Sequence, residues 1–214
     1  MRREIKVKRF LIVSVLALSV AMSGFGIVFA ENTDTENENV TEAIDDIDNK
    51  TENNNETAPE SAELGFSYTV SNDGVTITNV DDVSGKVTIP SEIDGKDVIE
   101  IANGAFGGST NITEVYIPDS VVKIGETAFA YSTGIKKVRL SKALKVIPNG
   151  AFNQCTSLIG ITVPYGVTVI EDNAFSSCPS LSSVSVPTTV TNISANAFDN
   201  SPNIVFYCKL SDEP

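Results

Sequence analysis

The sequence predicts a mainly β solenoid, in which the polypeptide coils through about five stacked turns of 23 residues. The first observation is an Ala-Phe dipeptide that recurs at this fixed interval. The second is a set of six further apolar or small positions that recur with the same period. The third is a short alternating strand pattern, usually followed by proline, within each unit. The dipeptides are Ala105-Phe106, Ala128-Phe129, Ala151-Phe152, Ala174-Phe175 and Ala197-Phe198.

Residues 1–30 have the pattern of a secretory signal peptide. Five basic residues precede position 10, and the stretch from Phe10 to Ala30 is apolar and carries no charge. It ends with small residues at Val28 and Ala30, so we expect cleavage after Ala30. An uncleaved membrane anchor is the alternative, because the apolar run is about long enough to span a bilayer.

Residues 31–63 form an acidic spacer in this interpretation. They contain twelve acidic residues, a single base (Lys50) and no aromatic residue. Such a composition cannot bury enough apolar area to offset conformational entropy, so the spacer is expected to be disordered. The acidity extends to the whole protein, whose net charge is −13. It argues against a nucleic-acid partner, which would require many phosphate-neutralising cations.

Residues 64–90 are expected to cap the N-terminal end of the solenoid. Alternating residues on both sides of a turn at Asn72-Asp73-Gly74 predict a β-hairpin with strands at 66–70 and 75–77. The first Ile-Pro pair, Ile89-Pro90, lies 28 rather than 23 residues before the next one. We assign the five extra residues to 91–98, where Asp94-Gly95 marks a protruding loop.

Residues 91–207 contain the repeats, and each unit has the same predicted path. A V-x-I strand points alternate residues inwards, and the proline after it turns the backbone because proline cannot extend the ladder. A second segment, V-x-x-I, then forms the opposite wall. The Ala-Phe pair follows, with the small residue at a corner and the ring in the centre. One turn cannot bury its own apolar face, whereas several stacked turns can.

These repeating columns resemble the BspA-like class of bacterial leucine-rich repeats, which shares the 23-residue unit, the Ile-Pro turn and the Ala-Phe signature. The resemblance covers about residues 87–207 and implies a right-handed leucine-rich-repeat solenoid. It also makes Ile204–Cys208 a closing strand, with Tyr207 in the core column of Val184, and leaves residues 208–214 as a C-terminal tail. Members of the class include adhesins, so the resemblance implies binding of macromolecules outside the cell.

The sequence does not favour an enzyme. Histidine is absent, which removes the commonest general base and the commonest zinc ligand. The acidic residues of the repeats form no recurring pair, and the glycines fall at turns rather than in a phosphate-binding loop. We therefore expect no catalytic residues, no metal site and no cofactor. A carboxylate-based hydrolase remains as a remote alternative, which would require a deep cleft with two close carboxylates.

Two of the three cysteines occupy one column of the repeat. Cys155 and Cys178 stand where Ser109, Ser132 and Ser201 stand in the other turns. Adjacent turns bring such residues within disulfide range, but their side chains would point in parallel rather than toward each other. We expect two buried free thiols that behave as small hydrophobic residues.

Specificity must lie at outward positions, because the residues in phase with Ala-Phe build the core. One turn gathers several basic residues in an otherwise acidic protein. The candidate binding residues are Tyr116, Lys136, Lys137, Arg139, Lys145 and Ile159. A purely structural alternative pairs Glu114 with Lys137 and Asp119 with Lys142 across adjacent turns, and stacks Arg139 on Tyr116.

The functional hypothesis is a secreted or cell-surface module that binds a protein or a cell-surface polymer, with adhesion implied by the resemblance. Nucleic acid is not an expected partner, and contact with a membrane is expected only through residues 1–30 if they are retained. The alternative is a passive structural spacer in the cell envelope. The two hypotheses differ in whether exposed apolar and basic residues gather on one face.

Overall fold

The computed structural model describes residues 29–30, 65–81 and 83–209. This part of the protein forms strands and turns without a helix, and so contains no helix that could cross a membrane. The spacer and the residues after Lys209 lie outside it, as does the signal segment apart from two residues that pair with the last strand. The strands are β1 (Phe29–Ala30), β2 (Phe66–Val70), β3 (Val75–Val80), β4 (Gly85–Thr88), β5 (Glu92–Ile93), β6 (Lys96–Ile101), β7 (Ile112–Tyr116), β8 (Lys123–Ile124), β9 (Lys137–Arg139), β10 (Val146–Ile147), β11 (Gly160–Thr162), β12 (Val169–Ile170), β13 (Ser183–Pro187), β14 (Asn192–Ile193) and β15 (Val205–Lys209).

The predicted hairpin cap is confirmed. Strands β2 and β3 pair in antiparallel fashion, and the N–H of Ser71 donates to the C=O of Gly74 at 2.9 Å to close their turn. Strand β3 then pairs in parallel with β6, which joins the cap to the first wall of the solenoid. Phe66 is buried against the first turn, so the cap covers an apolar end that would otherwise face water.

The five extra residues form a second small hairpin, β5 and β6, that protrudes from the first turn. Its two turn residues, Asp94 and Gly95, have φ angles of 53° and 73°. This left-handed pair is typical of two-residue hairpins, whose twist it matches. The hydroxyl of Tyr68 donates to Asp94 Oδ2 at 2.8 Å, which ties the hairpin to the cap.

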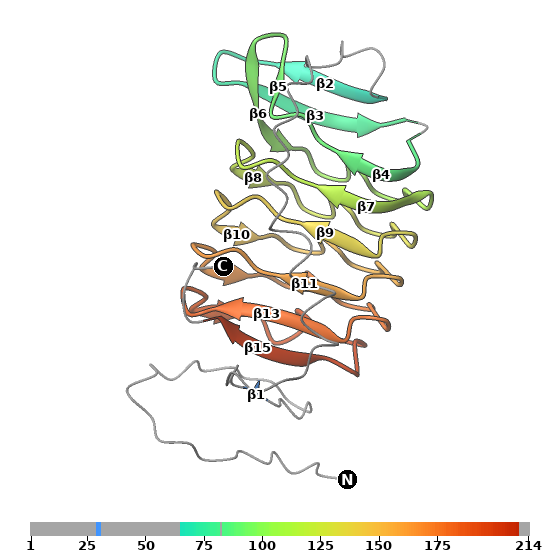
Figure 1. The fold of residues 1–214 in the computed structure, drawn as a ribbon, viewed down its shortest axis with the longest axis vertical. Coiled ribbons are helices and arrows are strands. Elements are labelled where there is room, and N and C mark those ends of the chain that lie inside the picture. The colour runs from blue at the N-terminus through green and yellow to red at the C-terminus, as the bar shows by residue number, and fades with distance from the viewer. Residues whose placement is uncertain (1–28, 31–64, 82, 210–214) are drawn as a thin grey trace, which may run out of the picture.

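Six longer strands, one from each turn, run parallel along one side of the stack (Figure 1). They form two ladders, β4–β7–β9 and β11–β13–β15. In β9 and β11 a buried residue stands between two outward ones, as in β9, where Val138 is 4% exposed. We call the outward side of these six strands the strand face.

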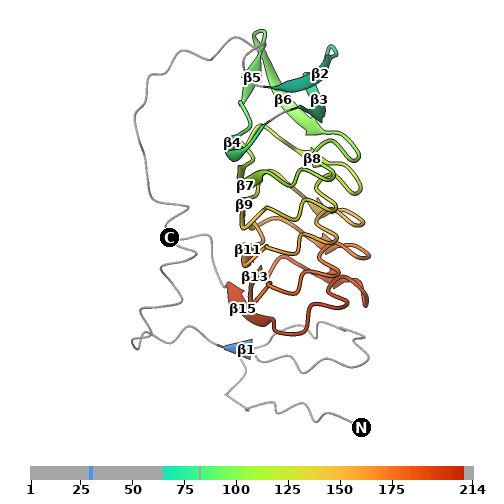
Figure 2. The same cartoon turned by 90° about the vertical axis from the view of Figure 1, so that its right-hand side faces the viewer.

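The opposite wall is built from the V-x-x-I segments, which form strands β6 and β8 and then β10, β12 and β14 (Figure 2). Corner turns containing Ala-Phe connect this wall to the strand face. The corners stack through backbone bonds, for example from the N–H of Phe129 to the C=O of Ala151 at 2.8 Å. The predicted mainly β solenoid is therefore confirmed. It has six long strands, one more than the five predicted turns would contain.

A ladder of phenylalanine rings runs through the centre of the molecule. Neighbouring centroids from Phe106 to Phe198 lie 4.8, 5.1, 5.4 and 5.3 Å apart, and the rings are stacked. Phe66 closes the ladder at the N-terminal end with a centroid distance of 6.1 Å. The rings of the recurring Ala-Phe pairs are almost fully buried, as the period predicts.

The prediction for the last turn is wrong in one respect, because Phe206 rather than Tyr207 takes the core column. Phe206 is the register partner of Val184 and packs edge-on against Phe198 at 5.2 Å. The stretch from Ile204 to this position is one residue shorter than in the preceding turn. Tyr207 is thereby moved to the outward side, beside Ser185.

A buried column of hydroxyl and thiol groups lines the ring ladder. Each donates to the backbone C=O of the phenylalanine in the preceding turn: Ser132 to Phe106 (2.5 Å), Cys155 to Phe129 (3.2 Å), Cys178 to Phe152 (3.2 Å) and Ser201 to Phe175 (2.9 Å). Both thiols are fully buried, and no disulfide joins them in the structure. Burial raises the pKa of Cys155, and it raises that of Cys178 to about 12. These cysteines act as hydrogen-bond donors as well as small apolar groups.

Candidate functional site

The outward residues of neighbouring strands form columns across the strand face. Glu114 of β7 lies in register with Lys137 of β9, and Gly160 of β11 lies in register with Ser183 of β13. Register alone places Tyr116 beside Arg139 in a second column. Strands about 4.8 Å apart bring such neighbours within side-chain reach, so this face is where the predicted binding residues can act together.

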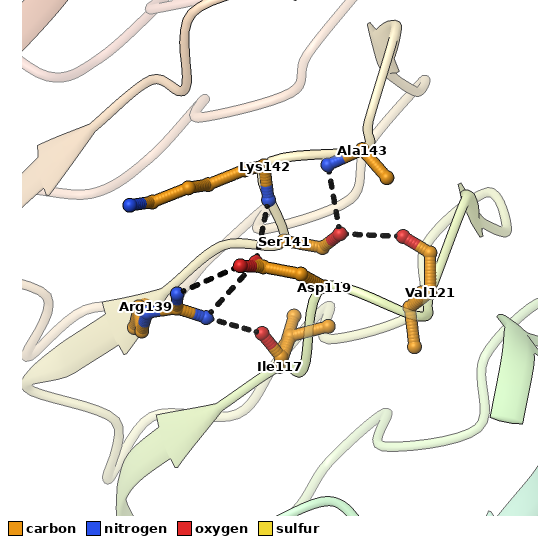
Figure 3. Close-up of polar contacts among 7 residues, drawn as sticks. All are labelled: Ile117, Asp119, Val121, Arg139, Ser141, Lys142 and Ala143. Carbon is orange, nitrogen blue, oxygen red and sulfur yellow. Dashed lines mark hydrogen bonds and ion pairs between the residues drawn. The ribbon is translucent and has the colours of Figure 1, made fainter. Parts of the chain in front are cut away.

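Arg139 is fully engaged in contacts with the preceding turn (Figure 3). Its Nη1 and Nη2 each lie 3.2 Å from a different oxygen of Asp119, and Nη1 also donates to the C=O of Ile117 at 3.1 Å. The guanidinium carbon lies 4.3 Å from the centroid of the Tyr116 ring, which confirms the stacking that the structural alternative predicts. The Arg139 side chain is only 13% exposed, so this pair stabilises the turn rather than facing a partner.

The predicted ion pair between Asp119 and Lys142 is replaced by a different arrangement. Asp119 accepts the backbone N–H of Lys142 at 2.9 Å and forms its ion pair with Arg139, whose planar fork matches both carboxylate oxygens. Partial burial acts to raise the pKa of Asp119. The hydrogen bonds from Lys142 and Arg139, with their charges, outweigh it and hold the pKa below its ordinary value.

Lys136 and Lys137 have no such partners. Within the described residues, neither lysine forms an ion pair, even though Glu114 is the register neighbour of Lys137. Lys136 is exposed and Lys137 is half-buried. Ile159 lies beside them, with its N–H donating to the C=O of Lys136 at 3.2 Å and its side chain 47% exposed. Lys136 and Ile159 thus lie side by side just before β9 and β11, next to Lys137 at the start of β9.

Lys145 does not belong to this group. The backbone turns at Ser141, whose hydroxyl donates to the C=O of Val121 at 2.6 Å, and Lys145 then begins the opposite wall beside β10. Its ammonium group reaches along the corner of the next turn, where a Cβ added at Gly166 would lie 3.3 Å from it. The structure therefore brings together Tyr116, Lys136, Lys137, Arg139 and Ile159 and places Lys145 elsewhere.

Gly160 and Ser183 are not among the residues predicted from the sequence. Gly160 follows Lys137 in the column, one strand further along the face, and Ser183 follows Gly160. Ser183 is 7% exposed, and its Oγ has no hydrogen-bond partner in the part of the protein that the structure describes. The glycine at position 160 could have indicated this site from the sequence. Glycine inside a strand weakens the strand, and it often marks a place where a ligand or another backbone approaches closely.

Two carboxylates of the opposite wall form hydrogen bonds between turns. A hollow of about 300 Å³ is lined there by Val169 and by polar residues of three turns. Its Glu171 accepts the N–H of Asn149 at 2.9 Å, and Asp172 accepts the hydroxyl of Ser194. Both acids thus serve as hydrogen-bond acceptors between turns. No cluster of three potential metal ligands occurs among the described residues.

Comparison with known proteins assigns the repeats. The family model described as "BspA type Leucine rich repeat region" matches residues 85–205 with six copies. The chain belongs to the BspA type leucine-rich repeat family. The match begins at Gly85, where β4 opens the ladder of long strands, and this accounts for the additional turn. A comparison with curated proteins returned no match.

Solved structures of leucine-rich repeat proteins resemble this fold. A leucine-rich cell surface protein of Faecalibacterium prausnitzii is 29% identical, with a TM-score of 0.61 over 69% of this chain and 38% of that one. A leucine-rich repeat protein of T. pallidum is 31% identical, with a TM-score of 0.63 over 72% and 83%. One of Bacteroides ovatus is 26% identical, with a TM-score of 0.61 over 68% and 40%. The protein thus spans well under half the length of the first and third relatives.

Proposed function

We propose that this protein is a secreted binding module that is displayed at the cell surface and holds another macromolecule against its strand face. The observation that carries the proposal is the pair Lys136 and Lys137, which project from one turn of an acidic protein with no ion-pair partner among the described residues. Cations left without a local partner are available to an anionic ligand, and they speed its encounter.

Three further features support this function. Ile159 adds an exposed apolar contact beside the lysines, and apolar contacts of this kind provide affinity that charge alone does not. Leucine-rich repeat proteins are in general non-enzymatic interaction modules, and the F. prausnitzii relative is described as a cell surface protein. Adhesion to a host or envelope macromolecule is the form of binding that best fits these properties.

The test is a binding assay on immobilised extracellular-matrix proteins and cell-envelope polymers. The protein secreted from the full-length gene is compared with a variant in which Lys136 and Lys137 are both alanine. We expect the wild type to bind at least one anionic macromolecule and the variant to bind it about tenfold more weakly. Binding should weaken further as ionic strength rises, because salt screens exposed charges.

A matched control removes the same charge from the opposite wall. Lys123 and Lys145 are both exposed there, and Lys123 forms a surface ion pair with Glu100 that contributes little to stability. The Lys123→Ala, Lys145→Ala variant should bind as the wild type does. If the protein binds nothing in the assay, or if both double variants lose affinity equally, a passive structural role in the envelope is the better account.

A further inference from the structure

Gly160 occupies a position where the fold does not require glycine. Its φ is not in the left-handed region, unlike that of Gly104 and Gly150 at the corners. A Cβ added there would lie 3.5 Å from the C=O oxygen of Ser183 and 3.6 Å from its Cβ, which are ordinary contacts. Residues with side chains are favoured in strands over glycine, so neither backbone conformation nor space explains this choice.

The register partner, Ser183, is the second unfavourable choice at the same place. Its hydroxyl is buried without a hydrogen-bond partner among the described residues, although buried hydroxyls are normally bonded. Ser132, Ser141 and Ser201, which are equally buried, each donate to a backbone C=O. The Ser183 side chain stands beside the position that a Gly160 side chain would fill.

The ladder of long strands is also interrupted beside Gly160. Strands β7 and β9 pair, and so do β11 and β13, but no strand pairing joins β9 to β11 in the described part of the protein. The hydrogen bond from Ile159 to Lys136 is the link between them. A bare strand position and a break in the ladder therefore lie beside Lys136 and Lys137. The Ser183 hydroxyl, which has no partner among the described residues, lies one strand further on.

From this coincidence we infer that Gly160 and Ser183 form a binding subsite for an acidic protein segment in extended conformation. The backbone of that segment lies over Gly160, where the absent side chain allows close approach. The Ser183 side chain rotates to form a hydrogen bond with it, because its Oγ is buried in the unbound protein. The carboxylates of the segment meet Lys136 and Lys137, and an apolar side chain packs on Ile159. The inference rests on the proposed function and names the partner of the same face.

The chemistry of the surroundings favours a protein segment over an acidic polysaccharide. A polysaccharide supplies carboxylates and hydroxyls but no aliphatic side chain for Ile159. The ring of Tyr116 on the neighbouring strand β7 is already covered on one face by the Arg139 guanidinium. An extended peptide supplies both kinds of contact when acidic and apolar residues alternate at every second position, because side chains two residues apart point to the same face.

The test uses two substitutions that the fold should tolerate. Gly160→Thr adds a strand-favouring side chain, and Ser183→Ala removes a buried hydroxyl that has no partner. Both full-length variants should unfold at the same temperature as the wild type or higher. Both should nevertheless bind more weakly, Gly160→Thr by about tenfold or more and Ser183→Ala by about three- to tenfold. Ser185→Ala, on the same strand and also outward, is the matched control and should bind normally.

The probe is a fluorescein-labelled extended peptide of about eight residues, in which glutamate and leucine alternate at every second position and so share one face, and binding is followed by fluorescence anisotropy. Polygalacturonate is the polysaccharide comparison, and a peptide of lysine and leucine is the charge-reversed one. Peptide binding that both substitutions weaken supports the inference. Peptide binding that neither substitution weakens overturns the subsite, and binding of polygalacturonate alone overturns the assigned partner. If no probe binds while the protein still retains a macromolecule in the matrix and envelope assay, this inference fails and the proposed function stands.

Discussion

The Arg139 guanidinium lies 4.3 Å from the centroid of the Tyr116 ring, so these two outward side chains cover each other. The same guanidinium holds Asp119 through both of its terminal nitrogens. One residue thus joins two turns by an ion pair, a ring contact and a hydrogen bond to the backbone. The basic character of this turn therefore has two parts, since Arg139 joins two turns while Lys136 and Lys137 form no ion pair within the described residues.

Substitution of Arg139 should test this division. Arg139→Ala removes all three contacts and should lower the free energy of unfolding by about 1–3 kcal/mol. Arg139→Lys keeps the charge but cannot reproduce the planar fork, so it should recover only part of that loss. Urea unfolding measures both. A stability within error of the wild type for Arg139→Ala would contradict a structural role.

The pKa of Asp119 predicts a pH dependence. Because its pKa is lower in the folded protein than in the unfolded state, Asp119 contributes stability above the unfolded value, and this contribution is lost as pH falls through the folded value. Between about pH 5 and pH 2 the wild type should lose more stability than Asp119→Asn does. The carboxylate is partly exposed, so the difference should stay below about 1 kcal/mol. Melting temperatures of both proteins across this range provide the measurement, and parallel curves would disprove the link.

The column that contains Cys155 and Cys178 predicts which substitutions the core accepts. Cys178→Ser places there the residue that Ser201 supplies in the next turn, with the same bond to a phenylalanine C=O, and should change stability by less than about 1 kcal/mol. Cys178→Val preserves the volume more closely but removes the donor, and should cost about 0.5–1.5 kcal/mol. Chemical denaturation ranks the two variants. If valine proved the more stable, the thiol would be acting only as an apolar group.

Thr127 should be a site where glycine stabilises the protein. Its φ is 53°, a left-handed conformation that is costly for a β-branched residue, and the matching corner positions hold Gly104 and Gly150. Removing this cost outweighs the extra conformational entropy of glycine, so Thr127→Gly should raise the free energy of unfolding by about 0.5–1 kcal/mol. The control is Thr133→Gly, at a nearby exposed threonine whose φ is not positive, which should lower it. Thermal unfolding of the two variants decides the sign.

The sequence predicts the core of this protein well because the period acts directly on packing. Each Phe of the Ala-Phe pairs lies one turn from the next, so a repeat in the sequence becomes a stack of rings. The 23-residue period gives the wrong core residue in the last turn, where the spacing is one residue shorter. The last strand reaches its core position one residue early, and Phe206 therefore replaces Tyr207.

The candidate site could be predicted only in part. Register places Lys136, Lys137 and Ile159 together, and these positions follow from counting residues along the repeat. Lys145 is close to them in sequence but follows the turn at Ser141, so it belongs to another wall. The partner of Asp119 depends on side-chain length and fork geometry, which the period does not specify. The burial of the Ser183 hydroxyl and the break between β9 and β11 emerge only once the turns are stacked.

The corners that contain Ala-Phe join neighbouring turns through the same pattern of hydrogen bonds. The N–H of Phe106 donates to the C=O of Ala128 in the following turn, while the hydroxyl of Ser132 in that turn donates back to the C=O of Phe106. When a turn is inserted after another one, the preceding turn already supplies one hydrogen-bond donor and one acceptor. These bonds do not depend on the outward residues of the inserted turn. The length of such a solenoid and the partner that it binds can therefore evolve separately. Duplication of whole turns changes the length, and substitution of single outward residues changes the partner.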